Sequence, residues 1–395
     1  MDPIRVAHVV PDLAIGGAET ALVRLLESLD RASFVSLVVT LRDGGPLVGR
    51  AERAGARVAS LGMRSRVPSL RALLRLRAAL HAFAPDVVQG WMYHGNLAAW
   101  LGARLLGTRP AVAWNLRQSL ASLAHEPPAT RLVIRANALL SRRVEQIVNN
   151  STASAVQHAA LGFDASRVVV VPNGVDTALF LPNPAARAAL RTRLGLAPDA
   201  LLLGMVARVH PVKRHDLFLA AVADAVASGL DVHALLAGSG TSPASPELVH
   251  LVAAAGLAGR AHLLGERTDV ELVFPALDVL VSASGWAEGF PNAVAEAMAC
   301  GVPCVVTDTG DCAELLGAAG AVVPPGDGAA LAAALVDLLR LPAERRSALG
   351  RLGRERVAAR FSLGQSTARY AALYEELARA GTRTSLAGEH RKPAS

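Results

Sequence analysis

Several motifs that define common enzyme classes are absent from this sequence. There is no GxxxxGK[ST] phosphate loop, no Gly-x-Ser-x-Gly nucleophile elbow, no HExxH zinc motif and no Asp-x-Asp pair for a metal–diphosphate. The first apolar run, residues 4–10, is not followed by GxGxxG, so the dinucleotide fingerprint is missing as well. These absences argue against P-loop NTPases, serine hydrolases, zinc proteases and typical NAD-dependent oxidoreductases.

Cysteine and long apolar runs are also scarce. The three cysteines, at 300, 304 and 312, are an odd number in one segment without a histidine cluster. We therefore expect small buried residues there rather than a zinc site or a disulfide scaffold. No stretch reaches the ~18 apolar residues of a membrane span, and the N-terminus lacks the apolar core of a signal peptide. We expect a cytoplasmic protein without a transmembrane helix.

Positive charge is uneven and comes almost entirely from arginine. Residues 1–176 contain 20 arginines and no lysine against 12 acids, whereas residues 177–395 contain 20 Lys and Arg against 21 acids. Aromatic residues make up only 4% and are not interleaved with basic runs, which disfavours nucleic acid as a partner. The basic first half fits an anionic membrane surface or a solvated protein face.

Short apolar runs alternate with amphipathic stretches along most of the 395 residues. The runs predict strands and the stretches predict helices. The pattern restarts after the turn-forming segment 172–176, which indicates two domains. We predict an α/β protein of two doubly wound, Rossmann-like domains, with ligands in an interdomain cleft at the carboxyl ends of the strands. The predicted strands are 4–10, 34–40, 56–61, 86–91, 111–114, 145–148, 167–171, 201–206, 232–237, 261–264, 279–282 and 303–307.

The domain limits follow from this pattern. Residues 1–176 form the first predicted domain and residues 177–360 the second. A helix over 361–380 is expected to cross back to the first domain, and the polar tail 381–395 is expected to be disordered.

Two short segments carry residues suited to an anion. Gly16 and Gly17 lie between the first strand and a predicted helix over 18–29, where the backbone can approach a ligand closely. An ordinary tight turn explains this pair equally well. Arg208 follows the strand 201–206 and Lys213 lies where the next helix begins, so a guanidinium and an ammonium could bind one diphosphate. A solvated pair at a helix start is the alternative.

The segment after strand 279–282 gives the most specific signal. Glu288 and Glu296 flank a Gly-Phe-Pro-Asn turn at 289–292, whose proline favours a helix start. Carboxylates accept hydrogen bonds from sugar hydroxyls, and the N–H groups of Phe290 and Asn292 can donate at the helix N-terminus. Either glutamate alone could be a capping or exposed acid, but this does not explain the turn beside both.

A histidine completes the set of candidates. His94 follows the strand 86–91 in a predicted loop, where catalytic groups gather in such sheets, although a single histidine is often structural. After the next strand, residues 114–118 read Trp-Asn-Leu-Arg-Gln and offer further polar groups, including Arg117.

These motifs together resemble one family. The glycine pair at 16–17, the Pro-Asn-Gly-Val-Asp turn at 172–176, Arg208 with Lys213, and Glu288-x7-Glu296 occur in this order in retaining GT-B glycosyltransferases of the bacterial group 1 (family 4) type. The resemblance covers about residues 4–376. It implies an acceptor-binding first domain and a donor-binding second domain, in enzymes that assemble polysaccharides, lipopolysaccharides and glycolipids.

The resemblance also implies roles for individual residues. Glu288 and His94 are the expected catalytic residues. The family often has a histidine at the end of the fifth strand, but residues 114–118 contain none here, so that His94, or Arg117 in an electrostatic role, would take its place. Gly310 is expected near the phosphates. The expected donor-binding residues are Gly16 and Gly17 (diphosphate), Arg208 and Lys213 (diphosphate), Gly265 and Arg267 (base), Glu288, Gly289, Phe290, Pro291 and Asn292 (sugar), and Glu296 (ribose).

The expected activity follows from these roles. A hexosyl or N-acetylhexosaminyl group would pass from a nucleotide sugar, foremost a UDP-sugar, to a lipid-linked or polysaccharide acceptor with retention, needing neither metal nor cofactor. A sugar-nucleotide epimerase of the same fold, a non-catalytic scaffold member and, more distantly, an NAD-dependent oxidoreductase are the alternatives. Arginines among leucines in 69–83 and 130–143 suit an anionic membrane that carries the acceptor, or equally a solvated face.

Overall fold

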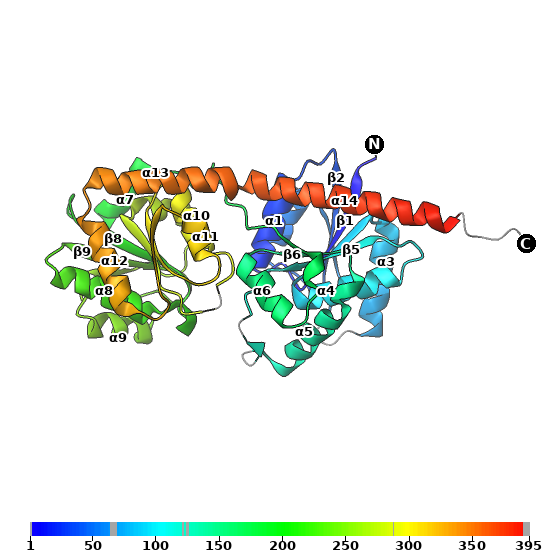
Figure 1. Cartoon of the computed structure of the whole chain (residues 1–395), viewed down its shortest axis with the longest axis horizontal. Helices are drawn as coiled ribbons and strands as arrows, with labels where there is room; N and C mark the ends of the chain where they lie inside the picture. The colour runs from blue at the N-terminus through cyan, green and yellow to red at the C-terminus, as the bar shows by residue number, and fades with distance from the viewer. Residues whose placement is uncertain (1, 64–68, 121, 124–125, 287, 390–395) are drawn as a thin grey trace, which may run out of the picture. The chain divides into compact units, whose positions relative to one another are not determined.

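The computed structural model describes residues 2–63, 69–120, 122–123, 126–286 and 288–389. They form two compact units, each built on a parallel sheet with helices on both faces (Figure 1). Unit 1 comprises Met1–Gly174 and Leu363–Ser395, and unit 2 comprises Val175–Ser362. The predicted α/β class with two Rossmann-like folds is confirmed.

The described sheet of unit 1 has seven strands in the order β3-β2-β1-β4-β5-β6-β7. Neighbouring strands pair in parallel, and most are buried on both faces, which explains why they read as apolar runs. The order reverses between β1 and β4. The strands are β1 (Ile4–Val10), β2 (Phe34–Thr40), β3 (Arg57–Ser60), β4 (Val87–Trp91), β5 (Ala111–Leu116), β6 (Gln146–Asn149) and β7 (Val168–Val170).

Helices cover both faces of this sheet. One face packs against α1 (Gly17–Ser28), α2 (Val48–Arg53) and α14 (Leu363–Glu389). The other packs against α3 (Leu70–Phe83), α4 (Met92–Arg104) and α5 (Pro128–Leu140). Helix α6 (Thr152–Ala160) precedes β7.

Unit 2 contains a described sheet of six strands in the order β10-β9-β8-β11-β12-β13. Here the order reverses between β8 and β11, and an open α/β sheet binds ligands at such a reversal. The strands are β8 (Leu201–Val206), β9 (Val232–Ala237), β10 (Ala261–Leu263), β11 (Val279–Ser282), β12 (Cys304–Thr307) and β13 (Gly320–Val323). The helices are α7 (Pro184–Arg193), α8 (His215–Ala227), α9 (Pro246–Ala254), α10 (Asn292–Ala299), α11 (Cys312–Leu316), α12 (Gly328–Arg340) and α13 (Ala343–Arg360).

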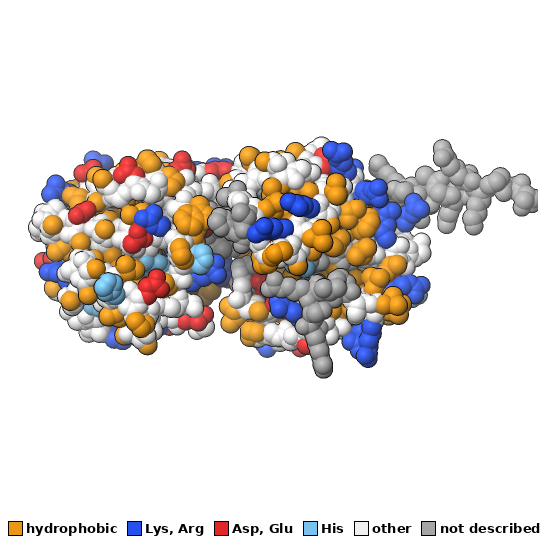
Figure 2. Space-filling view, turned by 90° about the horizontal axis from the view of Figure 1, so that it is seen from below, with side chains coloured by type: hydrophobic (Ala, Val, Ile, Leu, Met, Phe, Trp, Pro, Cys, Tyr) orange, Lys and Arg blue, Asp and Glu red, His pale blue; other side chains and the backbone are white. Residues whose placement is uncertain are grey.

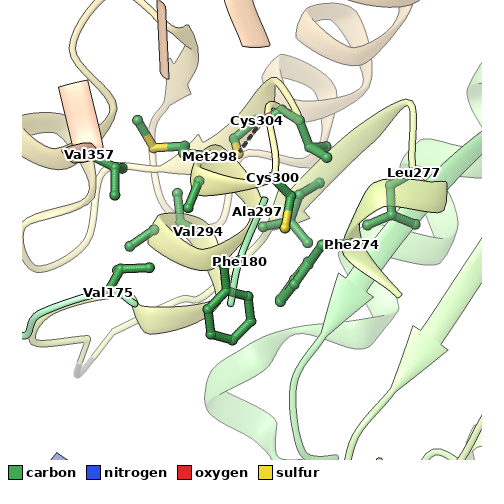
Figure 3. Packing of buried hydrophobic residues seen from close by; sticks show 14 of the residues in the cluster. Val175, Phe180, Phe274, Leu277, Val294, Ala297, Met298, Cys300, Cys304 and Val357 are labelled. Atoms are coloured by element: carbon green, nitrogen blue, oxygen red, sulfur yellow. Dashed lines mark hydrogen bonds between the residues drawn. The ribbon is translucent and has the colours of Figure 1, made fainter. Parts of the chain in front are cut away.

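Helix α10 is fixed by its apolar face. Val294, Ala297 and Met298 are fully buried and point into a core that includes Phe180 and Phe274 (Figure 3). At ~1.5–3 kcal/mol for each large apolar side chain taken from water, this burial holds the helix firmly in place. The N-terminus of α10 is therefore a rigid feature of unit 2.

The three cysteines belong to the apolar cores, as predicted. Cys300, Cys304 and Cys312 are buried and free, and the Cys304 thiol donates to the carbonyl oxygen of Val302 at 3.4 Å (Figure 3). Burial raises the pKa of Cys300 to about 12, so its thiol stays neutral at physiological pH. Among the described residues, no group of three or more His, Cys, Asp or Glu side chains is placed to hold a metal ion.

Strand β13 and the end of helix α14 differ from the sequence-based prediction. Strand β13 was not predicted, because it opens with Gly320 and only Val322 and Val323 are β-branched. Helix α14 continues to Glu389, past residue 380 where the tail was expected to begin. Residues 390–395 lie outside the described part. In the portion of the chain that the structure covers, no helix is long and apolar enough to span a membrane.

Helix α14 packs on the sheet of unit 1 through buried tyrosines. The Tyr374 hydroxyl donates to Gln89 Oε1 at 2.5 Å, and the Asn115 amide donates to the Tyr370 hydroxyl at 2.7 Å. Arg117 donates to Tyr370 and to Asn173, and its guanidinium lies 5.4 Å from the centre of the Trp91 ring. Burial lowers the pKa of Arg117. The contacts of Arg117 thus hold the C-terminal helix on the sheet.

Candidate active site

A pocket of about 160 Å³ lies in unit 2 at the reversal of its strand order. Its walls come from the ends of β8 and β11, the turn before α8 and the first turn of α10. Polar groups there lie where the fold concentrates ligand-binding residues. The lining residues are Met205–Ala207, Lys213, Leu280–Ser284, Glu288 and Phe290–Val294.

An ion pair forms the polar part of this pocket. The Lys213 ammonium donates to Glu288 Oε1, and the Ser284 hydroxyl donates to the same oxygen at 2.6 Å. The two charged side chains are only 25% and 13% exposed, so water screens the pair weakly. Two residues that are 75 positions apart are thus held together, and Ser284, which the sequence did not single out, fixes the carboxylate.

A tight backbone turn brings Lys213 to the pocket. His210 Nδ1 accepts a hydrogen bond from the Val212 N–H at 3.2 Å, which caps the short 3₁₀ turn Pro211–Lys213. Arg214 follows with φ of 53°, a left-handed conformation that ends the turn before α8 begins. Lys213 therefore lies in a turn just before α8, and not at the helix start where the sequence predicted it.

The backbone around Glu288 rests on the loop after β12. At Gly310 φ is 60°, and a Cβ there would lie 2.5 Å from the carbonyl oxygens of Glu288 and Gly289. The Asp311 N–H donates to the Gly289 carbonyl at 3.1 Å, and the Thr307 hydroxyl donates to the Ser284 carbonyl at 2.7 Å. Only glycine at 310 allows this close approach, so the structure places Gly310 directly against the segment that carries Glu288.

The remaining residues of the Gly-Phe-Pro-Asn turn lead into the N-terminus of α10. Phe290 and Pro291 are buried, whereas Asn292 is exposed at the first position of the helix. The first turn of α10 lines the pocket, and a helix N-terminus favours negative charge. Glu296 lies half-buried one turn further along α10 and does not line this pocket.

Arg208, Gly265 and Arg267 lie on loops at the same edge of the sheet. The Val209 N–H donates to the Ser239 carbonyl, and the Gly238 N–H donates to the Gly265 carbonyl, both at 2.8 Å, so the loops after β8, β9 and β10 are joined. Arg208 itself is exposed and lies outside the described pocket lining.

Asp269 orients one of these side chains. Arg267 Nε donates to Asp269 Oδ1 at 2.7 Å, and this hydrogen bond lowers the pKa of the Asp269 carboxyl. Asp269 is an orienting residue that the sequence did not reveal, because nothing in the local pattern distinguishes it from a loop acid.

A second pocket, of about 550 Å³, lies in unit 1 where the order of its strands reverses. Gly16 and His94 both line it, so the structure brings these two predicted residues together. Gly17 is the first residue of α1 and does not belong to this lining. The lining residues are Pro11, Asp12, Ala14–Gly16, Glu19, Leu41, Arg42, Met63, Met92–His94, Gln118, Glu126, Pro127 and Thr130.

The prediction that His94 lies in a loop was wrong. Strand β4 ends at Trp91, and α4 begins at Met92 with φ of 59°, so His94 is in the first helical turn. Gly90 and Gly95 explain the direct junction, since a Cβ at either position would collide with the backbone of the neighbouring element. The helix therefore packs on the strands without a connecting loop.

Three carboxylates, those of Asp12, Glu19 and Glu126, belong to the lining of the unit 1 pocket. The Glu19 carboxylate lies directly against Gly16, and burial, with a smaller effect of Asp12, raises the Glu19 pKa. Arg42 pairs with Asp12, and the Gln118 amide donates to Glu126 at 2.6 Å. Acceptor oxygens of this kind bind hydroxyl groups. Glu19 follows the glycine pair at 16–17 by two residues, but its place in a pocket could not be predicted from the sequence.

Tyr93 lines the same pocket, and its hydroxyl is held by a buried histidine. Its hydroxyl lies 2.8 Å from His158 Nε2, and His158 Nδ1 lies 2.7 Å from the Ser154 carbonyl. Burial raises the Tyr93 pKa and lowers that of His158, so both groups are neutral at pH 7. This neutral pair fixes the start of α4, and with it the position of His94.

Solved structures identify the fold of this chain. HepE of Anabaena, solved in complex with UDP and glucose, matches with a TM-score of 0.80 and 21% identity over 94% of this chain and 100% of that one. Sucrose-phosphate synthase of Thermosynechococcus elongatus matches with a TM-score of 0.77 and 21% identity over 96% and 100%. The fold is that of the GT-B glycosyltransferases.

Similarity in sequence narrows the class to a family. Models described as Glycosyltransferase Family 4 and Glycosyl transferases group 1 match residues 15–179 and 200–341. The lipopolysaccharide core mannosyltransferase LpsB of Rhizobium meliloti is 33% identical over 251 residues, 61% of this chain and 68% of LpsB. A D-inositol 3-phosphate glycosyltransferase of Geodermatophilus obscurus is 31% identical over 333 residues, 79% and 72% of the two chains.

The chain belongs to the group 1 glycosyltransferases. This confirms the resemblance drawn from its motifs and removes the NAD-dependent oxidoreductase from the alternatives. The roles assigned to individual site residues stay predictions.

Proposed function

We propose that this chain is a retaining glycosyltransferase that moves a hexosyl or N-acetylhexosaminyl group from a UDP-sugar to a lipid-linked or polysaccharide acceptor, without a metal. The observation that carries the proposal is the Lys213–Glu288–Ser284 cluster in the pocket at the strand reversal of unit 2. HepE, which has the same fold, was solved with UDP-glucose, which supports the donor class. LpsB is named as a mannosyltransferase of lipopolysaccharide core biosynthesis, which supports the acceptor class.

The charges in unit 2 suit a departing diphosphate. Lys213 and Arg208 would offset its negative charge, assisted by the positive end of α10, so that no divalent cation is needed. Glu288 would accept hydrogen bonds from the sugar hydroxyls, Glu296 from the ribose, and the Gly265–Arg267 segment would contact the base.

Retention follows most simply from attack on the face that the diphosphate leaves. The bond between the anomeric carbon and the diphosphate oxygen breaks, and the acceptor oxygen bonds to the same face of that carbon. The acceptor proton passes to the departing oxygen, so no side-chain nucleophile is required. Glu288 would stabilise the positive charge that develops on the sugar. We propose that the unit 1 pocket, which Gly16 and His94 line, receives the acceptor.

A nucleotide-binding experiment tests the donor site. We expect UDP to raise the melting temperature of the purified protein more than GDP, ADP or NAD does, because a ligand at about 100 times its Kd adds about 2.7 kcal/mol of stability. The shift should disappear in Lys213→Ala and in Glu296→Ala. With UDP-sugar and acceptor, NMR should show a product that retains the anomeric configuration.

Other outcomes would change the proposal. A covalent sugar adduct on Glu288 would overturn the front-face mechanism, and an inverted product would overturn retention. Conversion of the nucleotide sugar to its epimer without an acceptor would favour the epimerase. No stabilisation by any nucleotide would favour a scaffold member that has lost donor binding.

We also propose that the helices of unit 1 contact an anionic membrane. Leu70 and Leu74 on α3 are 73% and 57% exposed, and Leu132 and Leu139 on α5 are 70% and 79% exposed. Basic and hydrophobic side chains lie next to one another on the face of unit 1 shown in Figure 2. Such a mixture favours a surface of anionic lipid. The basic residues are Arg71, Arg75, Arg77, Arg131, Arg135, Arg142 and Arg143.

Liposome flotation tests this contact. We expect the protein to float with vesicles that contain phosphatidylglycerol and to stay behind with purely zwitterionic vesicles, since each basic residue near an anionic surface adds about 1 kcal/mol. A Leu132→Ser, Leu139→Ser double variant should float less. Val249→Ser, at an exposed apolar position of unit 2, serves as the control. Equal recovery with both vesicle types would contradict the proposal.

A further inference from the structure

Unit 1 contains an apolar pocket of about 70 Å³ beside the polar one. Ten of its eleven lining residues are apolar, and the exception is His94. Leu73, Leu97, Leu101 and Val133 are only half-buried, so water reaches the pocket. The lining residues are Leu41, Leu61, Met63, Ala72, Leu73, Leu76, His94, Leu97, Ala98, Leu101 and Val133.

The two pockets of unit 1 adjoin one another. Leu41, Met63 and His94 line both of them, from the end of β2, the segment after β3 and the first turn of α4. His94 therefore lies at the boundary, with the acids and Gln118 on the polar side and leucines on the other. A single ligand with a polar part and an apolar part could occupy both.

An open apolar hollow costs free energy when it is empty. Protein interiors normally pack to crystal-like density, and exposed apolar patches on a soluble unit mark places where something binds. Leu70 and Leu74 extend the apolar surface along α3, on the helix that also supplies Ala72, Leu73 and Leu76 to the pocket. The pocket and its rim together have the character of a binding site.

We propose that this pocket binds the first carbons of a hydrocarbon chain attached to the acceptor, whose hydroxyl-bearing part lies in the adjoining polar pocket. The proposal rests on the proposed function and selects one acceptor class, an amphiphile, over a purely hydrophilic glycan. At ~10–15 Å³ for each water-sized probe, the pocket has room for about five such probes, which suits a few methylene groups rather than a whole lipid.

A series of alkyl glucosides tests the proposal. Methyl, butyl, hexyl and octyl β-glucoside share one sugar, and their Kd values for the full chain can be measured by calorimetry below the micelle concentration and without a donor. We expect affinity to rise about fourfold per methylene over the first few carbons, as apolar burial dictates, and then to level off. The same order should appear in kcat/KM when the glucosides serve as acceptors.

Two variants should remove the chain-length dependence. Ala98→Leu fills the pocket from α4 and Leu73→Phe fills it from α3, so one remains informative if the other folds poorly. Both should keep the weak affinity for methyl glucoside, and Ala78→Leu, at an exposed position of α3, should behave like the unmodified protein. Equal affinity across the series, or a dependence that both filled variants retain, would overturn the proposal.

The outcome is independent of the donor site. Because the glucosides are measured without nucleotide, loss of the chain-length effect leaves the stabilisation by UDP untouched. Conversely, if the protein failed to bind UDP, the glucoside Kd values would still show whether the apolar pocket binds a hydrocarbon chain.

Discussion

Replacing Lys213 by methionine is expected to lower kcat/KM by about 10²–10³-fold. Methionine keeps the length of the side chain and removes its charge, so the leaving diphosphate loses a preorganised cation in a weakly hydrated pocket. Loss of one such group typically costs ~3–4 kcal/mol of transition-state stabilisation. Steady-state kinetics with a UDP-sugar and an acceptor measure this directly.

A companion variant separates charge from geometry. Lys213→Arg retains the positive charge but replaces a compact ammonium by a planar fork, and we expect an intermediate loss. The melting temperature should fall in Lys213→Met, because the mostly buried Glu288 carboxylate loses its cationic partner, and should fall less in Lys213→Arg, which keeps the charge. In both variants Ser284 still donates to Glu288. A Lys213→Met protein with near-normal kcat/KM would remove this residue from the diphosphate site.

The second large effect is expected from Gly310→Ala. An alanine at φ of 60° costs about 1–2 kcal/mol, and its Cβ would in addition meet the carbonyl oxygens of Glu288 and Gly289. The segment must shift to relieve the contact, and Glu288 moves with it. We expect kcat/KM to fall at least tenfold, a loss that kinetics can follow, together with a lower melting temperature.

Gly256→Ala provides the matched control. Gly256 also lies in unit 2 and has φ of 69°, but a Cβ there would meet nothing within 4 Å. This variant carries the same backbone strain without the collision, so it should lose some stability and keep its activity. If both variants lost activity equally, strain alone would explain the effect and the support of Glu288 by Gly310 would be disproved.

The apolar strands of both sheets were predictable because parallel strands buried on both faces form continuous runs. Runs at 4–10, 34–40, 201–206 and 232–237 coincide with β1, β2, β8 and β9. Strand β13 was not predicted, because a short segment beginning Gly-Ala has little local preference for a strand. It becomes a strand by pairing with β12. Long-range pairing, rather than local preference, makes it a strand.

The sequence predicted which residues belong to the candidate site, but not which of them contact one another. The motifs identified Lys213 and Glu288, yet their direct pairing depends on the strand order that places β8 beside β11. The position of His94 was misjudged because the junction at Met92 depends on a positive φ and on two close glycine contacts. Neither the positive φ nor these close contacts can be predicted from the residue pattern alone.

The chain order of unit 1 has a consequence for synthesis. Its first 174 residues emerge from the ribosome early, but α14, which supplies Tyr370 and Tyr374, emerges only after all of unit 2. Until then, Arg117 and Gln89 lack the tyrosine hydroxyls that later satisfy them. Unit 2 is one contiguous segment and can mature first, whereas the half of the enzyme that is proposed to hold the acceptor is completed last.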